Sequence, residues 1–194
     1  MPLAQLNTLD YGMGWGEWAR VSKSLGCRSY GHDLAPELVR AAARYDIEPH
    51  TNQLYHFINT EQVLEHIADP AGTVEYLAAC LLPGGILKVS VPSTKGVESV
   101  LGKLVAGQAF ANPELMPIAP VEHLNCFTLR ALEGLGWRFG LEPVKPSYRH
   151  RYAFLRRRRT LGTSPTHAAK EIARPLVQWR NPRNLYLWLR RAIS

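Results

Sequence analysis

Hydrophobic and polar positions along this chain follow two periods, and the change from one to the other separates expected strands from expected helices. The first apolar stretch ends at three glycines in alternate positions, Gly12, Gly14 and Gly16, which indicates a strand that turns tightly into a helix. Helical spacing then runs over residues 17–25, where Gly26 stops it. We therefore expect a strand, a glycine turn and a helix at the start of the chain.

The same rhythm continues through the middle of the chain. Strands are expected over residues 28–33, 47–50, 54–59 and 86–91. Helices are expected from Pro36 and after Asp69-Pro70, where an N-cap residue and a proline suit a first helical turn. Strands that alternate with helices predict an α/β fold of the Rossmann-like, doubly wound type, with a mostly parallel sheet covered on both faces.

Residues 93–122 break this rhythm with an amphipathic stretch over 97–110 and a proline-rich loop. An insertion after the fifth strand lies above the carboxyl ends of the strands, where ligands bind, so it is predicted to be a lid over an acceptor. A short helix over 128–135, ended by Gly136, and strands over 137–144 and 148–155 complete a domain of residues 1–155. Residues 156–194 are expected to form a tail with amphipathic helices over 168–179 and 185–192.

Charge divides the chain in the same way. Residues 1–144 carry 10 basic and 15 acidic side chains, whereas residues 145–194 carry 13 basic and one acidic. The net charge of +7 therefore comes from a basic tail and does not indicate a uniformly basic nucleic-acid binder. Such a tail suits an anionic membrane surface, a protein partner or nucleic acid, and packing on its own domain is the plain alternative.

Composition also indicates a compartment. No stretch approaches the ~20 apolar residues that span a bilayer, and no signal peptide is recognised. Three scattered cysteines imply neither a disulfide framework nor a metal knuckle. We expect a cytoplasmic protein, peripheral to the inner membrane surface if the tail binds lipid; the oligomeric state is not predicted.

The glycine turn predicts a cofactor site, because the first amides of the following helix point at a ligand. Asp10 stands two residues before Gly12, and its charge would repel a pyrophosphate but attract an ammonium and a sulfonium. Asp33, at the end of the second expected strand, suits the hydroxyls of an adenosyl ribose in either kind of cofactor. The sign of the charge at Asp10 favours S-adenosyl-L-methionine over NAD.

Five motifs resemble the class I S-adenosylmethionine-dependent methyltransferases, and four of them appear in the family's order: LDYGMGWG at 9–16, DLAPE at 33–37, VLEHIADP at 63–70, LPGG at 82–85 and HLNCF at 123–127. The last motif resembles the one found in a subgroup with small-molecule acceptors, which includes the ubiquinone-type O-methyltransferases. The resemblance implies that the methionine end is held by the first motif and the ribose by Asp33. The residues it marks for the cofactor are Asp10, Gly12, Met13, Gly14, Gly16, Asp33 and Leu34.

The expected adenine site is unusual. Family members usually place an acid after the third strand and about ten further residues before the fourth, but here only Thr51, Asn52 and Gln53 intervene. Asn52 is the candidate for the adenine contact, with Gln53 or a looser site as alternatives. Glu61 is a further candidate for the polar groups of the cofactor.

Methyl transfer from a sulfonium needs few catalytic groups, because the cofactor carries the activation. His66, after the fourth strand, and His123, after the insertion, are the candidates for a base or an orienting group. Asn125 is the candidate for holding an acceptor hydroxyl, and structural roles for all three stay open. Some ubiquinone-type enzymes use a divalent metal beside a similar Glu-His pair, but Gln62 stands where they tend to have another acid, so no metal site is expected.

The sequence thus predicts an S-adenosylmethionine-dependent methyltransferase that acts on a small-molecule acceptor by O-methylation. Two alternatives stay open. One is a binding protein that kept the fold and lost turnover, which the short adenine connection suggests. The other is an RNA methyltransferase that uses the arginine-rich tail.

Overall fold

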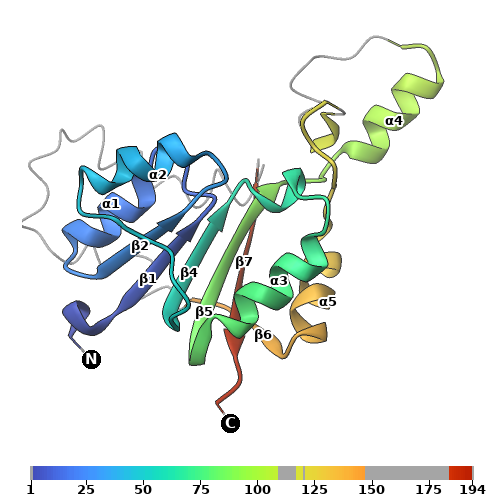
Figure 1. Ribbon diagram of the computed structural model, residues 1–194. Helices are drawn as coiled ribbons and strands as arrows, with labels where there is room; N and C mark the ends of the chain where they lie inside the picture. The colour runs from blue at the N-terminus through green and yellow to red at the C-terminus, as the bar shows by residue number, and fades with distance from the viewer. Residues whose placement is uncertain (1, 109–116, 120, 147–183, 194) are drawn as a thin grey trace, which may run out of the picture.

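A seven-stranded sheet organises the computed structural model, which describes residues 2–108, 117–119, 121–146 and 184–193 (Figure 1). The strand order is β3-β2-β1-β4-β5-β7-β6. The strands are β1 (Asn7–Tyr11), β2 (Arg28–His32), β3 (Glu48–Pro49), β4 (Tyr55–Glu61), β5 (Leu81–Pro92), β6 (Leu141–Val144) and β7 (Asn184–Arg191). The helices are α1 (Glu17–Ser24), α2 (Pro36–Ala43), α3 (Pro70–Ala79), α4 (Val97–Val105) and α5 (Leu129–Arg138), with short 3-10 helices η1 (Leu3–Gln5) and η2 (Leu64–His66).

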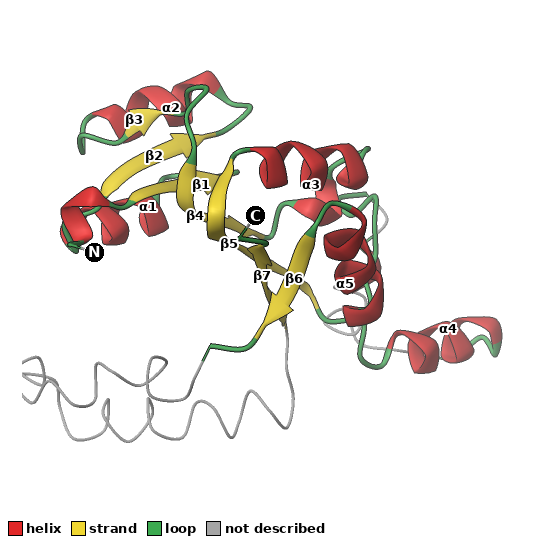
Figure 2. Cartoon of the chain, turned by 90° about the horizontal axis from the view of Figure 1, so that it is seen from below, coloured by secondary structure: helices red, strands yellow, loops and turns green. Residues whose placement is uncertain are grey.

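The strands from β3 to β5 are all parallel. The chain order runs outward from β1 to β3 on one side of the sheet and from β4 to β5 on the other, so the direction of winding changes between β1 and β4. Helices α1 and α2 flank the half that holds β1, β2 and β3, and α3 and α5 flank the half that holds β5, β6 and β7 (Figure 2). Leu9 packs in the core beneath α3, whereas the next residue, Asp10, meets α1, so helices cover both faces. The prediction of a Rossmann-like, mostly parallel α/β fold is confirmed.

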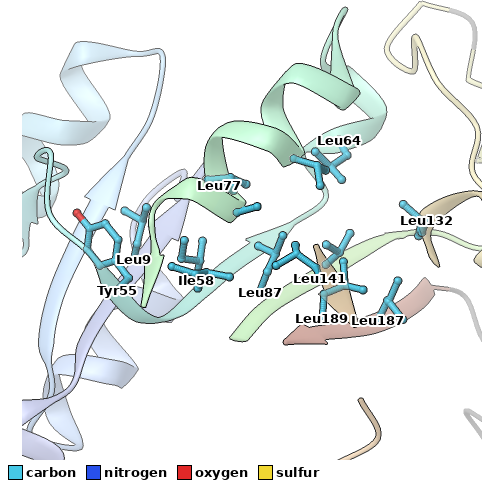
Figure 3. Close-up of a cluster of buried hydrophobic side chains, with 14 of the residues drawn as sticks. Leu9, Tyr55, Ile58, Leu64, Leu77, Leu87, Leu132, Leu141, Leu187 and Leu189 are labelled. Atoms are coloured by element: carbon cyan, nitrogen blue, oxygen red, sulfur yellow. The ribbon is translucent and has the colours of Figure 1, made fainter. Parts of the chain in front are cut away.

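The main core lies between the sheet and helices α3 and α5. Leu9, Ile58, Leu87 and Leu189 reach it from four strands and are almost completely buried, and Leu77 covers them from α3 (Figure 3). Burial of side chains of this size stabilises the fold by about 1.5–3 kcal/mol each. This core keeps the carboxyl ends of β1 and β4 side by side, which is where the glycine turn begins.

The prediction of a helix over residues 185–192 is wrong, because this segment is strand β7. It lies antiparallel between β5 and β6. Leu187 and Leu189 face the core while Tyr186 and Arg190 face away, as in a strand. Leu185, Trp188 and Leu189 also fit helical spacing, and over so short a stretch the two patterns cannot be told apart from sequence. The Arg191 guanidinium donates to the carbonyls of Ala78 and Ala79 at the end of α3, so basic character here serves the domain itself.

Two other expected elements, the closing strand of the domain over 148–155 and the tail helix over 168–179, lie outside the described residues. Within the part that the structure describes, no helix is long and apolar enough to cross a bilayer. In the insertion, α4 forms part of the expected amphipathic stretch and extends away from the sheet (Figures 1 and 2).

A ring of histidines and tyrosines closes the short connection between β3 and β4. His50 Nδ1 lies 2.7 Å from the hydroxyl of Tyr55, and its other ring nitrogen bonds to the hydroxyl of Tyr76 on α3. The His32 ring meets the His50 ring edge to face, 5.9 Å between centroids. Nothing in the sequence indicated that His32 and His50 lie together, and their contacts anchor residues 50–54 to α3 without a helix of their own.

Gly136 was expected to end the last helix of the domain, but α5 continues through it to Arg138. Glycine is required there for packing, since a Cβ at this position would lie 2.6 Å from Leu189 Cδ2. At Gly134, two residues earlier in the same helix, a Cβ would meet nothing within 4 Å.

We expect Gly136→Ala to lower the free energy of unfolding by about 1–3 kcal/mol, because the added methyl group pushes α5 away from β7. Gly134→Ala is the matched control and should raise it by up to ~1 kcal/mol through helix propensity alone. Urea titrations of both variants measure the difference. Equal stability of the two would show that α5 does not pack on β7 as described.

Candidate functional site

The glycine turn joins β1 to α1 and is built as the sequence predicts. All three glycines have positive φ, at 72°, 53° and 72° for Gly12, Gly14 and Gly16. Gly12 also has no room for a side chain, because a Cβ there would lie 2.4 Å from Cγ2 of Val63. The turn therefore depends on glycine for both its backbone conformation and its contact with the segment after β4.

A hollow of about 340 Å³ opens beside this turn. Its lining combines the glycine turn, the start of α1 and the end of β4, and it includes three carboxylates and two indoles. The lining residues are Asp10, Gly12, Met13, Trp15, Glu17, Trp18, Asn59 and Glu61. Trp15 is 70% exposed, whereas Trp18 is stacked on Phe57 with 5.5 Å between ring centroids. Acidic groups and an open aromatic ring suit a cationic ligand with an apolar part.

Asp10 is buried at the back of this hollow and already has partners. Its Oδ2 accepts from the backbone amide of Ala19, and its Oδ1 accepts from Nδ2 of Asn59 at 2.8 Å. Burial raises the pKa of the Asp10 carboxyl, and these two hydrogen bonds and the charge of Lys88 act in the opposite direction. The carboxyl group thus holds α1 and β4 in place and lines the hollow.

A row of hydrogen-bonded polar side chains continues from Asp10 across the neighbouring strands of the sheet. Asn59 is paired with Asp10 in the β1–β4 register and with Lys88 in the β4–β5 register. Lys88 Nζ donates to Oδ1 of Asn59 and to Glu61, 2.9 Å in each case. The sequence indicated Asp10 and Glu61 but missed Asn59 and Lys88, because only the strand order brings them together.

The remaining predicted cofactor residues surround the turn in different ways. Asp33 accepts hydrogen bonds from the backbone amides of Gly14, at 2.9 Å, and Ala35, at 3.0 Å. Leu34 is 91% exposed at the same edge, and Asn52 is an exposed residue of the β3–β4 connection. These three therefore lie at the carboxyl ends of β2 and β3, and Asp33 also fixes the glycine turn.

Met13 holds the glycine turn through its backbone, while its side chain points into the protein. Its amide donates to the carbonyl of His32 at 3.0 Å, and its side chain is buried in a small cluster with Ala19, Ala42 and Ile47. A Cβ at Gly31 would lie 2.1 Å from the Met13 sulfur, so β2 carries a glycine to accept this side chain.

The structure brings His66 and His123 together, as a pair with 4.9 Å between ring centroids. Glu65 lies beneath them, 1% exposed, and neither of its carboxylate oxygens has a hydrogen-bond partner among the described residues. Burial raises the pKa of the Glu65 carboxyl. Side-chain ligand atoms of the three residues all lie within 4.8 Å of one another. Sequence reasoning marked both histidines but missed Glu65, whose only signal was its place beside His66.

Asn125 is hydrogen-bonded to the segment that carries Glu65 and His66. Its side-chain amide donates to the carbonyl of Ile67 at 2.6 Å, and its backbone amide donates to the carbonyl of Glu65 at 3.0 Å. It therefore joins the segment after the insertion to the turn that carries Glu65 and His66. The prediction that Asn125 binds the acceptor is not tested by this geometry.

Comparisons with known proteins agree with these features. A family profile described as a methyltransferase domain matches residues 3–145. A ubiquinone biosynthesis O-methyltransferase from Methylobacterium sp. (strain 4-46) is 29% identical over 141 residues, which cover 58% of this chain and 57% of that protein. The chain thus spans little more than half the length of this curated relative.

Two solved structures show the same fold. An S-adenosylmethionine-dependent methyltransferase from Mesorhizobium loti has a TM-score of 0.62 and 15% identity, with 98% of this chain and 93% of that chain covered. Magnesium protoporphyrin IX methyltransferase from Synechocystis PCC 6803, solved with bound S-adenosylhomocysteine, has a TM-score of 0.61 and 14% identity, with 96% and 74% covered.

Proposed function

This chain belongs to the S-adenosylmethionine-dependent methyltransferases, and on that premise we propose that it transfers the methyl group to an oxygen of a small-molecule acceptor. S-adenosyl-L-methionine is the cofactor. The observation that carries the proposal is the cluster of Glu65, His66 and His123. Two of its members, Glu65 and His66, come shortly after β4, whose residues Asn59 and Glu61 line the hollow.

The path of the chain links the two sites. Glu61 lines the hollow at the end of β4, Val63 contacts the glycine turn, and Glu65 and His66 come next on η2. Over so few residues the chain passes from the cofactor to the histidines, so an acceptor held by them lies near the methyl donor. Holding both partners in line is the largest contribution that a protein makes to such a transfer.

The histidines suit an acceptor with a hydroxyl group. His66 Nδ1 donates to the carbonyl of Glu122 at 2.7 Å, which leaves its Nε2 as an acceptor toward a hydroxyl proton. The relatives named for ubiquinone biosynthesis O-methylation support oxygen as the acceptor atom.

Mass spectrometry after incubation with isotopically methyl-labelled S-adenosylmethionine tests this proposal. The purified chain is incubated with the small-molecule fraction, the RNA fraction and the protein fraction of a bacterial extract, each in a separate reaction. We expect label in the small-molecule fraction, placed on an oxygen by fragmentation. Label confined to RNA would replace the proposal with an RNA methyltransferase, and cofactor binding without transfer in any fraction would indicate a binding protein.

A further inference from the structure

Lys88 is a charged residue in an otherwise apolar part of the sheet. It stands in β5 between Leu87 and Val89, which are almost completely buried in the core, and its own side chain is only 14% exposed. Lysines are rarely buried in a central strand, because desolvation of an ammonium group is costly. The ion pair with Glu61, whose side chain is 41% exposed, could form at the surface and does not by itself explain this position.

The hydrogen bonds between Lys88 and Asp10 all run in one direction. Lys88, Asn59 and Asp10 lie directly opposite one another on three neighbouring strands. Lys88 Nζ donates to Oδ1 of Asn59 at 2.9 Å, and Nδ2 of Asn59 donates to Oδ1 of Asp10 at 2.8 Å. The other carboxyl oxygen, Oδ2, accepts from the backbone amide of Ala19 at 3.2 Å. Both oxygens of Asp10 therefore face donors, which suits an ionised carboxylate.

Lys88 sets this direction because an ammonium group can only donate. A half-turn of the Asn59 amide would bring its Nδ2 toward Nζ of Lys88 and its Oδ1 toward Oδ1 of Asp10, so that donor would face donor and acceptor would face acceptor. Protonated Asp10 would require that half-turn, since its proton needs an acceptor. Burial raises the pKa of the Asp10 carboxyl, and the hydrogen bond from Asn59 and the charge of Lys88 both act against this rise.

We propose that Lys88 is a positioning residue of the cofactor site, which fixes the Asn59 amide and thereby keeps Asp10 as the carboxylate that attracts S-adenosylmethionine. The described residues that line the hollow include Asp10 and Asn59 but not Lys88, so Lys88 acts through Asn59 and not by contact. The inference rests on the use of this hollow by the cofactor. It does not depend on the acceptor, because cofactor affinity is measured with no acceptor present.

Calorimetry of S-adenosylmethionine binding to Lys88→Met tests the proposal. Methionine nearly keeps the length of the side chain but has no donor, so we expect the affinity at neutral pH to fall about 10-fold, as for loss of one hydrogen bond to a charged group. Loss of a positive charge near the hollow would by itself tighten the binding of a cation, so the sign of the change separates positioning from simple charge. Lys88→Arg keeps the charge and the donors and should bind within about threefold of the parent chain.

The pH profile gives a readout that a merely structural role would not move. In Lys88→Met, the pH below which S-adenosylmethionine affinity weakens should rise by about one unit, because nothing then opposes the half-turn of Asn59. In an Asp10→Asn background, Lys88→Met should cause no further loss of affinity. Arg190→Met is the matched control: Arg190 lies on the same face of the sheet as Lys88, is paired with Glu142, and its loss should leave the affinity within about twofold of the parent chain.

Melting curves establish that each variant is folded. Asn59→Ala breaks the same row of hydrogen bonds with the Lys88–Glu61 pair intact, so it should raise the pH of weakening in the same direction and replaces Lys88→Met if that variant does not fold. Unchanged or tighter cofactor binding by Lys88→Met, an unmoved pH profile, or equal losses in the parent and Asp10→Asn backgrounds would overturn the proposal. A parent chain that binds the cofactor and shows these effects, but methylates no small molecule, would contradict the proposed function alone.

Discussion

Replacement of Gly12 by alanine is expected to abolish measurable S-adenosylmethionine binding. The new Cβ would lie 2.4 Å from Cγ2 of Val63, and the residue would have to keep a φ of 72°. A side chain at positive φ costs about 1–2 kcal/mol, and the clash adds a further 1–3 kcal/mol unless the turn moves. Gly12 lines the hollow proposed for the cofactor together with Asn59 and Glu61 of β4, so movement of the turn changes the shape of that hollow. Calorimetry should show at least a 1000-fold loss of affinity.

Gly140→Ala is the matched control for this experiment. Gly140 has nearly the same φ, 71°, but a Cβ there would meet nothing within 4 Å, and the residue lies far from the turn in sequence. This variant should lose about 1 kcal/mol of stability and retain cofactor binding. If Gly12→Ala binds the cofactor as tightly as Gly140→Ala does, the glycine turn is not part of the cofactor site.

Much of the fold could be predicted from sequence because its signals are local. The alternation of strands and helices, the glycine turn and the N-cap at Asp69 each depend on a few neighbouring residues, and the structure shows all of them. The last strand could not be predicted in the same way. Leu185, Leu187 and Leu189 have the alternating spacing of a strand, but Leu185, Trp188 and Leu189 also have the spacing of a helix. The segment is a strand because it pairs with both β5 and β6, which the local sequence does not reveal.

The candidate site shows a similar limit. Residues next to a motif, such as Asp10, Asp33 and His66, carry a signal in their spacing. Asn59 and Lys88 do not, because they meet Asp10 through the register of two neighbouring strand pairs. Glu65 has a place in a motif, but its burial and its contact with His123 depend on how residues 122–125 fold back onto η2.

Asp10 illustrates how such a register changes the meaning of a residue. Its position two residues before Gly12 suggested a carboxylate whose charge attracts the cofactor. In the structure its two oxygens hold Ala19 and Asn59, so its attraction for a cation acts through the field in the hollow as well as through any direct contact. Because few waters surround a buried carboxylate, its field is screened less than that of a surface charge.

The affinity for S-adenosylmethionine should therefore fall more than 100-fold in Asp10→Asn. The substitution keeps the shape of the side chain but removes a negative charge from the hollow, and its new amide group opposes the Asn59 donor. Glu61→Gln removes an exposed carboxylate that Lys88 already neutralises, so it should lose less than 10-fold. Calorimetry of both variants, with melting curves to show that they are folded, measures the contrast.

The pH dependence of cofactor binding gives the same prediction a second readout. Burial raises the pKa of Asp10, so its contribution to stability is full below the ordinary pKa of the carboxyl and is lost as the pH rises through the raised value. A bound cation favours the ionised form, and the affinity for S-adenosylmethionine should accordingly weaken as the pH falls through that raised value. S-adenosylhomocysteine lacks the sulfonium and should weaken less, and Asp10→Asn should remove the difference between the two. Equal pH profiles for the two ligands in the parent chain would show that the charge of Asp10 does not act on the sulfonium.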